Sequence, residues 1–292
     1  MQKKHLYAYG HQLLFHAQHL KESNGFIQIL LCEELSLKTY THKIFFETNQ
    51  GREIYLCSPK SLDEDNNIWA FVVEECVTFF CDIKRKTICY TKAEKFSQEL
   101  MEYWLIHIVL PLYFTLEGRY YFFHTGSVAI DGKAVLFMGD SYAGKSTMTD
   151  YFLKQQHPLL SDDKLATFYA NESKCFMAHA SHPYHRPYRA KEDLGKKTEN
   201  FEQKSYEIGN IYWLEPVTAE KDIRIRELKG IKKFERLRYS TEMDVAINQK
   251  ERFRYIAKFA NAVSMYEVEV PHDMAKLPKV YEAIMQHIKG EE

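Results

Sequence analysis

Short runs of β-branched and aromatic residues fill the first third of the chain, and polar turn residues separate them. These runs predict strands, and together they predict a small, mostly β N-terminal domain over residues 1–96. The run at 78–90 alternates well enough to predict a hairpin that closes near Lys84 and Arg85, whereas the acidic stretch 58–67 predicts a loop. The expected strands are 5–15, 26–32, 43–47, 52–57, 68–74 and 78–90.

From residue 97 onward the pattern mixes helical and strand periods, which predicts an α/β domain over residues 97–292. The stretch 97–116 predicts a long helix. Its most apolar part, 103–116, contains His107 and Pro111, which indicate a buried helix with a kink. This part is too short to cross a bilayer. Asp131-Gly132 predicts a tight hairpin between two strands within 118–138. The further elements expected are helix 147–155, a strand ending before Asp162, strand 208–214, helix up to 260, strand 263–270 and helix 274–288.

Between the second hairpin strand and the helix at 147 lies the pattern G-x-x-x-x-G-K-[ST], the signature of a phosphate-binding loop. Gly139 lets the chain leave the strand sharply, and Gly144 lets backbone N–H groups approach phosphate oxygens. Lys145 offers a cation to the outer phosphates, and the Ser146 hydroxyl can ligate Mg²⁺. The alternative is a chance glycine-serine turn, but strand, loop and helix occur in the required order. The expected nucleotide-binding residues are Gly139, Asp140, Ser141, Tyr142, Ala143, Gly144, Lys145, Ser146 and Thr147.

Two adjacent carboxylates, Asp162 and Asp163, end the next apolar strand, one helix and a turn beyond the loop. If the two strands are neighbours, both carboxylates lie beside the outer phosphate of the nucleotide. One could then hold Mg²⁺ while the other accepts the proton of an attacking hydroxyl. An Asp-Asp turn or a helix cap is the alternative interpretation.

Three motifs together resemble the catalytic domain of HPr kinase/phosphorylase and its wider group of HPr-kinase-like proteins. They are His124-Thr-Gly-Ser-Val-Ala-Ile, Gly139-Asp-Ser-Tyr-Ala-Gly-Lys-Ser and Leu160-Ser-Asp-Asp, and the resemblance spans roughly residues 118–215. A weaker likeness extends to the peptide-modifying branch, the lasso-peptide precursor kinases. It lies in the separate β-rich N-terminal domain and in Tyr7-Ala-Tyr-Gly10, His182-Pro-Tyr-His-Arg186 and Ile211-Tyr-Trp-Leu-Glu-Pro216.

This resemblance implies a P-loop kinase domain of HPr-kinase type that uses ATP and Mg²⁺ to phosphorylate a serine-type hydroxyl on a peptide or protein. By the same resemblance Asp162 is the general base, and His124 is the partner of the acid/base carboxylate. Asp163 is a carboxylate that holds Mg²⁺ or positions the reacting groups, Ser146 is a Mg²⁺ ligand, and Lys145 contacts the phosphates. Arg186 would lie near the phosphates or the acceptor.

Two departures from the family pattern narrow the expected activity. The bifunctional enzymes carry an acidic residue after the loop serine, where this chain has Thr147, and they carry an Arg-Gly-Leu-Gly signature that this sequence lacks. Both departures argue against phosphoserine phosphorolysis and against HPr itself as the acceptor. A kinase that acts on another acceptor is consistent with both departures.

Composition adds few constraints. The 292 residues carry 39 Lys+Arg against 40 Asp+Glu, a net charge of −1, so no global charge favours nucleic acid or a membrane surface as a partner. The six cysteines lack a C-x-x-C pair and are interpreted as reduced core residues. No targeting segment is evident, so a cytoplasmic location is the expectation. Family members are often oligomeric, so the resemblance leaves a homo-oligomer open, although no surface in this sequence proves it.

Three further stretches carry chemistry without a settled role. His179, His182 and His185 recur every third residue, but Pro183 and Pro187 break any helix that would align them, so no metal site is assigned. The charged segment 190–206 is either a lid or acceptor-binding loop or a solvated excursion. The basic stretch 223–238 would suit an acidic leader peptide or a nucleotide phosphate, although a solvated helix face is the commoner case.

Two other classes of function stay open on the sequence alone. One is a small-molecule kinase or a phosphoenolpyruvate-carboxykinase-like enzyme, which shares a related phosphate loop and Asp-Asp edge. The other is a non-catalytic nucleotide-binding regulatory module.

Overall fold

The structure, a computed structural model, describes residues 5–16, 27–32, 35–49, 51–186, 192–242 and 248–290. Phe26, the first residue of an expected strand, and Ala190, the first of the charged segment, lie outside these ranges. By its internal contacts the chain forms two compact units. Unit 1 comprises residues 1–120, 191–194 and 245–248, and unit 2 comprises residues 121–190, 195–244 and 249–292.

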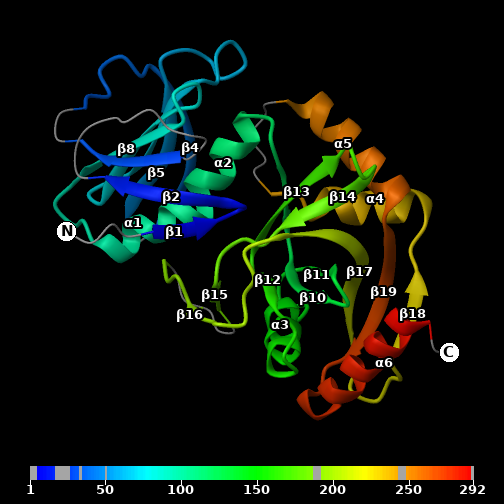
Figure 1. Cartoon of the computed structure of the whole chain (residues 1–292). Helices are drawn as coiled ribbons and strands as arrows, with labels where there is room; N and C mark the ends of the chain where they lie inside the picture. Colours follow the sequence, from blue (N-terminus) through cyan, green and yellow to red (C-terminus); the bar gives the residue numbers. More distant parts are fainter. Residues whose placement is uncertain are drawn as a thin grey trace. The chain divides into compact units, whose positions relative to one another are not determined.

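Unit 1 is built on one mixed sheet, which has eight strands within the described residues (Figure 1). Their order across the sheet is β1-β2-β3-β8-β7-β6-β5-β4. The strands are β1 (His5–Ala8), β2 (His11–His16), β3 (Ile27–Leu31), β4 (His42–Asn49), β5 (Arg52–Ser58), β6 (Ile68–Val73), β7 (Val77–Asp82) and β8 (Thr87–Lys92).

Local turn chemistry explains where these strands begin and end. The expected hairpin at 78–90 is confirmed, because β7 and β8 pair antiparallel with Phe79 opposite Tyr90. The expected single strand 5–15 was wrong. Tyr9 and Gly10 both have positive φ, 52° and 83°, so the chain reverses there and β1 pairs with β2.

The helical segment after this sheet packs within unit 1. It consists of α1 (Gln98–Trp104), a π-helical turn η1 (Leu105–Val109) and α2 (Leu110–Leu116). The irregularity therefore precedes Pro111, whose missing N–H is tolerated in the first turn of α2. Tyr9 donates a hydrogen bond to the Ile106 carbonyl (3.1 Å), and the Phe71 ring lies 6.0 Å from the Trp104 ring. These contacts show that the helical segment packs in unit 1. The domain boundary expected between residues 96 and 97 stays a prediction.

Unit 2 is a mixed sheet with helices on its faces (Figure 1). Its strand order is β12-β10-β11-β17-β14-β13-β9, with β19 also paired to β17 and β18 paired to β19. The sheet strands are β9 (Tyr121–His124), β10 (Gly126–Ile130), β11 (Lys133–Met138), β12 (Leu159–Ser161), β13 (Lys164–Ala170), β14 (Cys175–His179), β17 (Ser205–Val217), β18 (Arg224–Glu227) and β19 (Ser264–Pro271). A short separate ladder joins β15 (Tyr184–His185) to β16 (Lys196–Lys197).

Alternate side chains along the strands of this sheet belong to two hydrophobic cores, one on each face. The helices are α3 (Lys145–Lys154), α4 (Gly230–Tyr239), α5 (Gln249–Ala262), the 3-10 turn η2 (Met274–Lys276) and α6 (Leu277–Lys289). On β11, Leu136 belongs to the core shared with α4 and α5, whereas Phe137 belongs to the core shared with α3 and α6. This is the two-residue period of a strand buried on both faces.

The expected hairpin at Asp131-Gly132 is confirmed. Both residues have positive φ, 50° and 78°, and Ile130 pairs with Lys133, as in a two-residue turn between β10 and β11. The prediction of two strands within 118–138 was wrong, because the chain forms three. Thr125 separates β9, which pairs with β13, from β10.

The sequence analysis considered that β12, the strand before the Asp pair, is a direct neighbour of β11, the strand before the glycine loop. In the structure the two strands are not direct neighbours. β10 lies between β11 and β12 and is antiparallel to both. The strands β11 and β12 therefore run in the same direction, and their carboxyl ends still meet at one edge of the sheet.

The six cysteines are free thiols; Cys57, Cys76 and Cys81 are buried. Within the described residues, no helix has the length and apolar character needed to cross a membrane.

Candidate functional site

The loop between β11 and α3 turns sharply around its two glycines. Gly139 has φ of 156°, and a Cβ there would lie 2.9 Å from the Ala143 Cβ and 3.0 Å from the Leu214 carbonyl oxygen. Only glycine fits so close an approach. Gly144 has φ of 94° and immediately precedes the first turn of α3. The first N–H groups of that helix therefore point into the loop without helical partners, which is the arrangement that binds anions.

Lys145 folds back over this loop. Its Nζ donates to the Gly139 carbonyl (2.9 Å) and to the Asp140 carbonyl (3.1 Å). Partial burial lowers the pKa of Lys145, and attraction to Asp163, Asp140 and Glu242 opposes that decrease. The ammonium group therefore lies among carboxylates at the carboxyl end of the sheet.

Asp162 is a buried carboxylic acid at this edge. Its Oδ2 accepts a 2.6 Å hydrogen bond from the Arg186 N–H, and its side chain also interacts with the Ser146 hydroxyl. Burial raises the pKa of Asp162 to about 7, with the neighbouring Asp163 adding to the increase and the Arg186 contacts opposing it. Its Oδ1 is buried and accepts no hydrogen bond from the described residues.

Asp163 lies among cationic groups instead. Its Oδ1 lies 3.0 Å from His124 Nδ1, and its Oδ2 lies 3.2 Å from Arg186 Nη2 and 3.5 Å from Lys164 Nζ. The two adjacent acids therefore have different surroundings: Asp162 is buried and held by a main-chain donor, whereas Asp163 lies beside two cationic side chains and an imidazole.

His124 contacts Asp163, whereas the resemblance implied a pairing with the acid/base carboxylate assigned to Asp162. Asp162 and Asp163 form the connection between β12 and β13, and it is the Asp163 carboxylate that lies beside His124 at the end of β9. Glu242 shares the same imidazole nitrogen at 3.4 Å and also lies 3.8 Å from Lys164 Nζ.

Sequence reasoning missed Lys164 and Glu242. Lys164 directly follows the Asp pair, and its buried position on β13, opposite His124, could have been suspected only from the strand pairing. Glu242 reaches the site because its N–H donates to the Phe122 carbonyl at 2.9 Å, beside β9. No local pattern signals that contact.

Arg186 supports both aspartates, through its N–H on Asp162 and its guanidinium on Asp163. Gly195 packs directly against it. A Cβ at Gly195 would lie 2.5 Å from Arg186 Cγ and 2.6 Å from the His185 carbonyl oxygen, at a φ of 91°. Part of the charged segment 190–206 therefore braces Arg186.

The remaining residues expected from the sequence lie on the glycine loop, on α3 and on nearby strands. Asp140, Ser141 and Tyr142 are exposed on the loop, Ala143 is buried, and Thr147 is half-buried on the first turn of α3. The three spaced histidines have separate environments. His179 Nδ1 lies 2.7 Å from the Ser205 hydroxyl, His182 Nδ1 accepts from the Tyr184 N–H at 3.3 Å, and His185 Nε2 lies 3.5 Å from Asp150 on α3. Burial lowers the pKa of His185.

The donors at the edge suit a hard divalent cation together with phosphate. The Ser146 hydroxyl and the carboxylates of Asp162 and Asp163 are oxygen donors of the kind that Mg²⁺ prefers. One of these oxygens, Asp162 Oδ1, is buried and accepts no hydrogen bond from the described residues. Lys145 and the first turn of α3 provide positive charge for an anion on the other side.

Comparisons with known proteins show a distant structural likeness. No family model matches the sequence, and no curated protein matches it. The chain is similar to a solved structure, the Hpr(Ser) kinase/phosphatase from Coxiella burnetii, with 14% identity and a TM-score of 0.36, over 57% of this chain and 90% of that one.

Proposed function

We propose that the protein is an ATP- and Mg²⁺-dependent kinase that transfers the γ-phosphate to a serine-type hydroxyl of a peptide or protein. In this proposal residues 97–292 form a P-loop catalytic domain of HPr-kinase type, and residues 1–96 form a smaller, mostly β domain. The motifs around His124, Gly139 and Asp162 support this assignment over other phosphate-loop enzymes.

One observation carries the proposal: the lysine and serine of the glycine loop meet the Asp pair at one edge of the sheet. Asp162 interacts with the Ser146 hydroxyl, and the negative charge of Asp163 opposes the decrease that burial causes in the pKa of Lys145. A terminal phosphate bound by the loop would thus lie between a cation and two carboxylates. Phosphoryl transfer depends on this combination of positioning and charge neutralisation.

Asp162 is the group best suited to accept the proton. A general base works best when its pKa lies near the working pH, and burial raises the pKa of Asp162 to about 7. The hydroxyl oxygen of the acceptor attacks the γ-phosphorus of ATP, the bond from that phosphorus to the ADP oxygen breaks, and the hydroxyl proton moves to Asp162. The products are the phosphorylated acceptor and ADP.

The other residues of the site bind the phosphates and Mg²⁺ or orient the carboxylates. Lys145 and the backbone N–H groups of the loop bind the phosphates. Ser146 and Asp163 would hold Mg²⁺, which supplies further neutralisation of the phosphate charge when it is bound. His124 and Arg186 fix the orientation of Asp163, at 3.0 and 3.2 Å.

Labelled ATP tests the proposal. The purified chain is incubated with [γ-³²P]ATP and Mg²⁺, in parallel with a library of serine-containing peptides and with a panel of hydroxylated metabolites. We expect label on peptides, and its loss in the Asp162→Asn variant with ATP binding retained. Label on metabolites alone would favour a small-molecule kinase, and tight ATP binding without any labelled product would favour a nucleotide-binding module.

A further inference from the structure

Two carboxylates in the site share the same two nitrogen partners. His124 Nδ1 lies 3.0 Å from Asp163 Oδ1 and 3.4 Å from Glu242 Oε1. Lys164 Nζ lies 3.5 Å from Asp163 Oδ2 and 3.8 Å from Glu242 Oε2. Each nitrogen is therefore nearly as close to Glu242 as to Asp163, and a small movement changes the carboxylate that it contacts.

The backbone places Glu242 on the same face as His124. The Glu242 N–H donates to the Phe122 carbonyl at 2.9 Å, and Phe123 pairs antiparallel with Thr241. Residues that lie opposite each other in an antiparallel pair share a face, and neighbours along a strand alternate between faces. Glu242 therefore shares a face with Phe122 and His124, whereas Phe123 and Thr241 belong to the other face.

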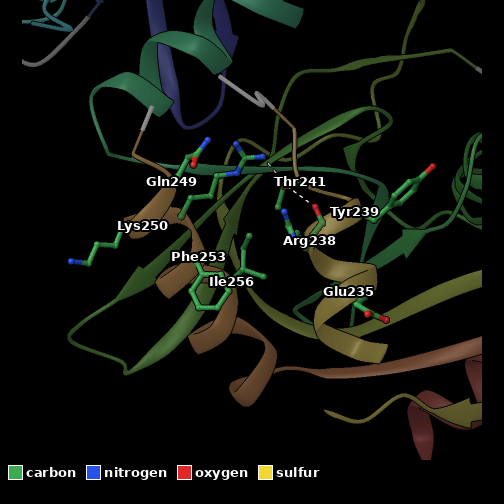
Figure 2. A pocket seen from close by; sticks show the side chains of 9 residues that line it. Glu235, Arg238, Tyr239, Thr241, Gln249, Lys250, Phe253 and Ile256 are labelled. Atoms are coloured by element: carbon green, nitrogen blue, oxygen red, sulfur yellow. Dashed lines mark hydrogen bonds between the residues drawn. The ribbon is translucent and has the colours of Figure 1, made fainter. Parts of the chain in front are cut away.

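Thr241 fixes the chain just before Glu242. It follows α4 and lies close to α5 (Figure 2). Its hydroxyl donates to the Arg238 carbonyl on α4 at 2.7 Å and accepts from the Arg252 guanidinium on α5 at 3.0 Å. Because the Glu242 N–H is also bonded to β9, the main chain holds Glu242 beside the site independently of the position of the Asp163 side chain.

Lys164 makes a second carboxylate important. Its side chain is only 9% exposed, and a buried ammonium group that loses its partner carboxylate strongly destabilises the state that contains it. In the proposed function Asp163 holds Mg²⁺, whose charge repels an ammonium group on the same carboxylate. Glu242 already lies beside Lys164, so the ammonium group keeps a carboxylate partner when Asp163 contacts a metal.

We propose that Glu242 is a positioning residue for Mg²⁺ binding: it holds the Lys164 ammonium group and the His124 imidazole while Asp163 turns to the metal. The inference rests on the proposed function, in which Asp163 is a Mg²⁺ ligand. Glu242 acts through Lys164 and contributes no oxygen to the metal. Its removal should therefore weaken metal binding only while the Lys164 ammonium group is present.

Metal binding without turnover tests this role. Mn²⁺ replaces Mg²⁺ as a paramagnetic probe, the non-hydrolysable ATP analogue AMP-PNP is present at saturation, and electron paramagnetic resonance measures free Mn²⁺ during titration of the full chain. We expect Glu242→Gln to weaken Mn²⁺ binding at least about tenfold. The control is Glu207→Gln, which removes a carboxylate from an exposed pair with Lys133 at the other end of β11 and should leave Mn²⁺ binding unchanged. Equal Mn²⁺ affinity in Glu242→Gln and wild type would overturn the inference.

A double-mutant cycle separates the contact with Lys164 from a general effect of charge. The charge of Glu242 also acts at the glycine loop, where it opposes the decrease that burial causes in the pKa of Lys145. Lys164→Met removes the ammonium group, and in this background Glu242→Gln should weaken Mn²⁺ binding by less than about twofold. The same loss in both backgrounds would show that Glu242 acts through its own charge and would refute the inference. Lys164→Gln, which lacks the charge but stays polar, provides the same comparison where methionine is not tolerated in the fold.

The Mg²⁺ dependence of phosphorylation separates this inference from the kinase proposal. Glu242→Gln should need at least about tenfold more Mg²⁺ for its half-maximal rate, and its rate at saturating Mg²⁺ should stay within about threefold of wild type. Peptide phosphorylation with an unchanged Mg²⁺ requirement would support the kinase and refute the role of Glu242. Mn²⁺ affinities that follow the cycle, without any labelled peptide, would support the role of Glu242 and refute the kinase.

Discussion

Asp162 Oδ2 accepts a 2.6 Å hydrogen bond from the backbone N–H of Arg186, a residue that lies 24 positions later in the chain. A main-chain donor holds this carboxylate in place without supplying a full charge, while the Arg186 guanidinium turns to Asp163 at 3.2 Å. Burial raises the pKa of Asp162 to about 7, and the Arg186 contacts oppose that increase. Arg186 therefore contacts both adjacent acids, one through its main chain and the other through its side chain.

The pH dependence of turnover should report Asp162. A base must be ionised to act, and its pKa is raised from 3.8 to about 7 in the folded protein. We expect kcat/KM for peptide phosphorylation to rise about tenfold per pH unit below about pH 7 and to level off above it. ATP affinity measured at each pH is the control for titration of the nucleotide. A flat profile between pH 5.5 and 8 would exclude Asp162 as the base.

Stability should change with pH through the same group. Because the folded pKa is raised, the folded state binds this proton more tightly than the unfolded chain does. The resulting stabilisation is present below about pH 4 and is lost as pH rises through about 7. Asp162→Asn removes the cost of ionisation, so we expect the variant to gain up to about 4 kcal/mol relative to wild type between pH 4 and pH 8. Thermal or urea unfolding of both proteins across this pH range measures the difference, and parallel curves would contradict the buried, perturbed carboxyl.

Gly195 offers a test of Arg186 that leaves the arginine itself unchanged. In Gly195→Ala the new Cβ would meet Arg186 Cγ at 2.5 Å, so the arginine must move away from both aspartates. The matched control is Gly118→Ala, which has a similar positive φ of 70° but open space around the Cβ. Both variants should lose about 1–2 kcal/mol for the backbone strain. Only Gly195→Ala should lose most of its phosphoryl-transfer rate in the labelled-ATP assay, and equal activities would show that Arg186 is not required.

Sequence patterns predicted the elements whose signals are local. The Asp131-Gly132 turn, the 78–90 hairpin and the helix after Gly144 each depend on a few adjacent residues, and each lies near its expected place. Asp273 likewise caps η2 through local chemistry, since its side chain accepts from the Ala275 N–H two residues later.

Relationships between distant strands had no such signal. Nothing local to residues 126–130 shows that β10 separates β11 from β12, because strand order is set by packing across the whole sheet. For the same reason the contact of His124 with Asp163, and the presence of Glu242 beside it, appeared only in the structure. The types of group in the site could be expected, but their pairing could not.

A substitution at Lys145 tests the contribution of its ammonium group to phosphate binding and transfer. Its ammonium group donates to two loop carbonyls and lies near Asp163, so Lys145→Met removes the cation that would contact the phosphates. We expect at least about a 100-fold loss of kcat/KM. Lys154→Ala, on the same helix but in an exposed pair with Asp150, is the control and should retain activity. Comparable losses in the two variants would refute the role of Lys145.

A buried ion pair in unit 1 gives a prediction that is independent of function. Arg52 Nη2 lies 2.5 Å from Glu192 Oε2, both side chains are less than 10% exposed, and Trp104 Nε1 donates to the other carboxylate oxygen at 3.0 Å. Glu192→Ala leaves the guanidinium buried without its partner carboxylate, so we expect a loss of about 3–5 kcal/mol in the free energy of unfolding. The exposed pair Lys43–Glu53 in the same unit, with side chains 47% and 51% exposed, is the control, and Lys43→Ala should cost no more than about 1 kcal/mol. Urea unfolding followed by tryptophan fluorescence measures both, and similar small losses would mean that water reaches Arg52 in the folded protein.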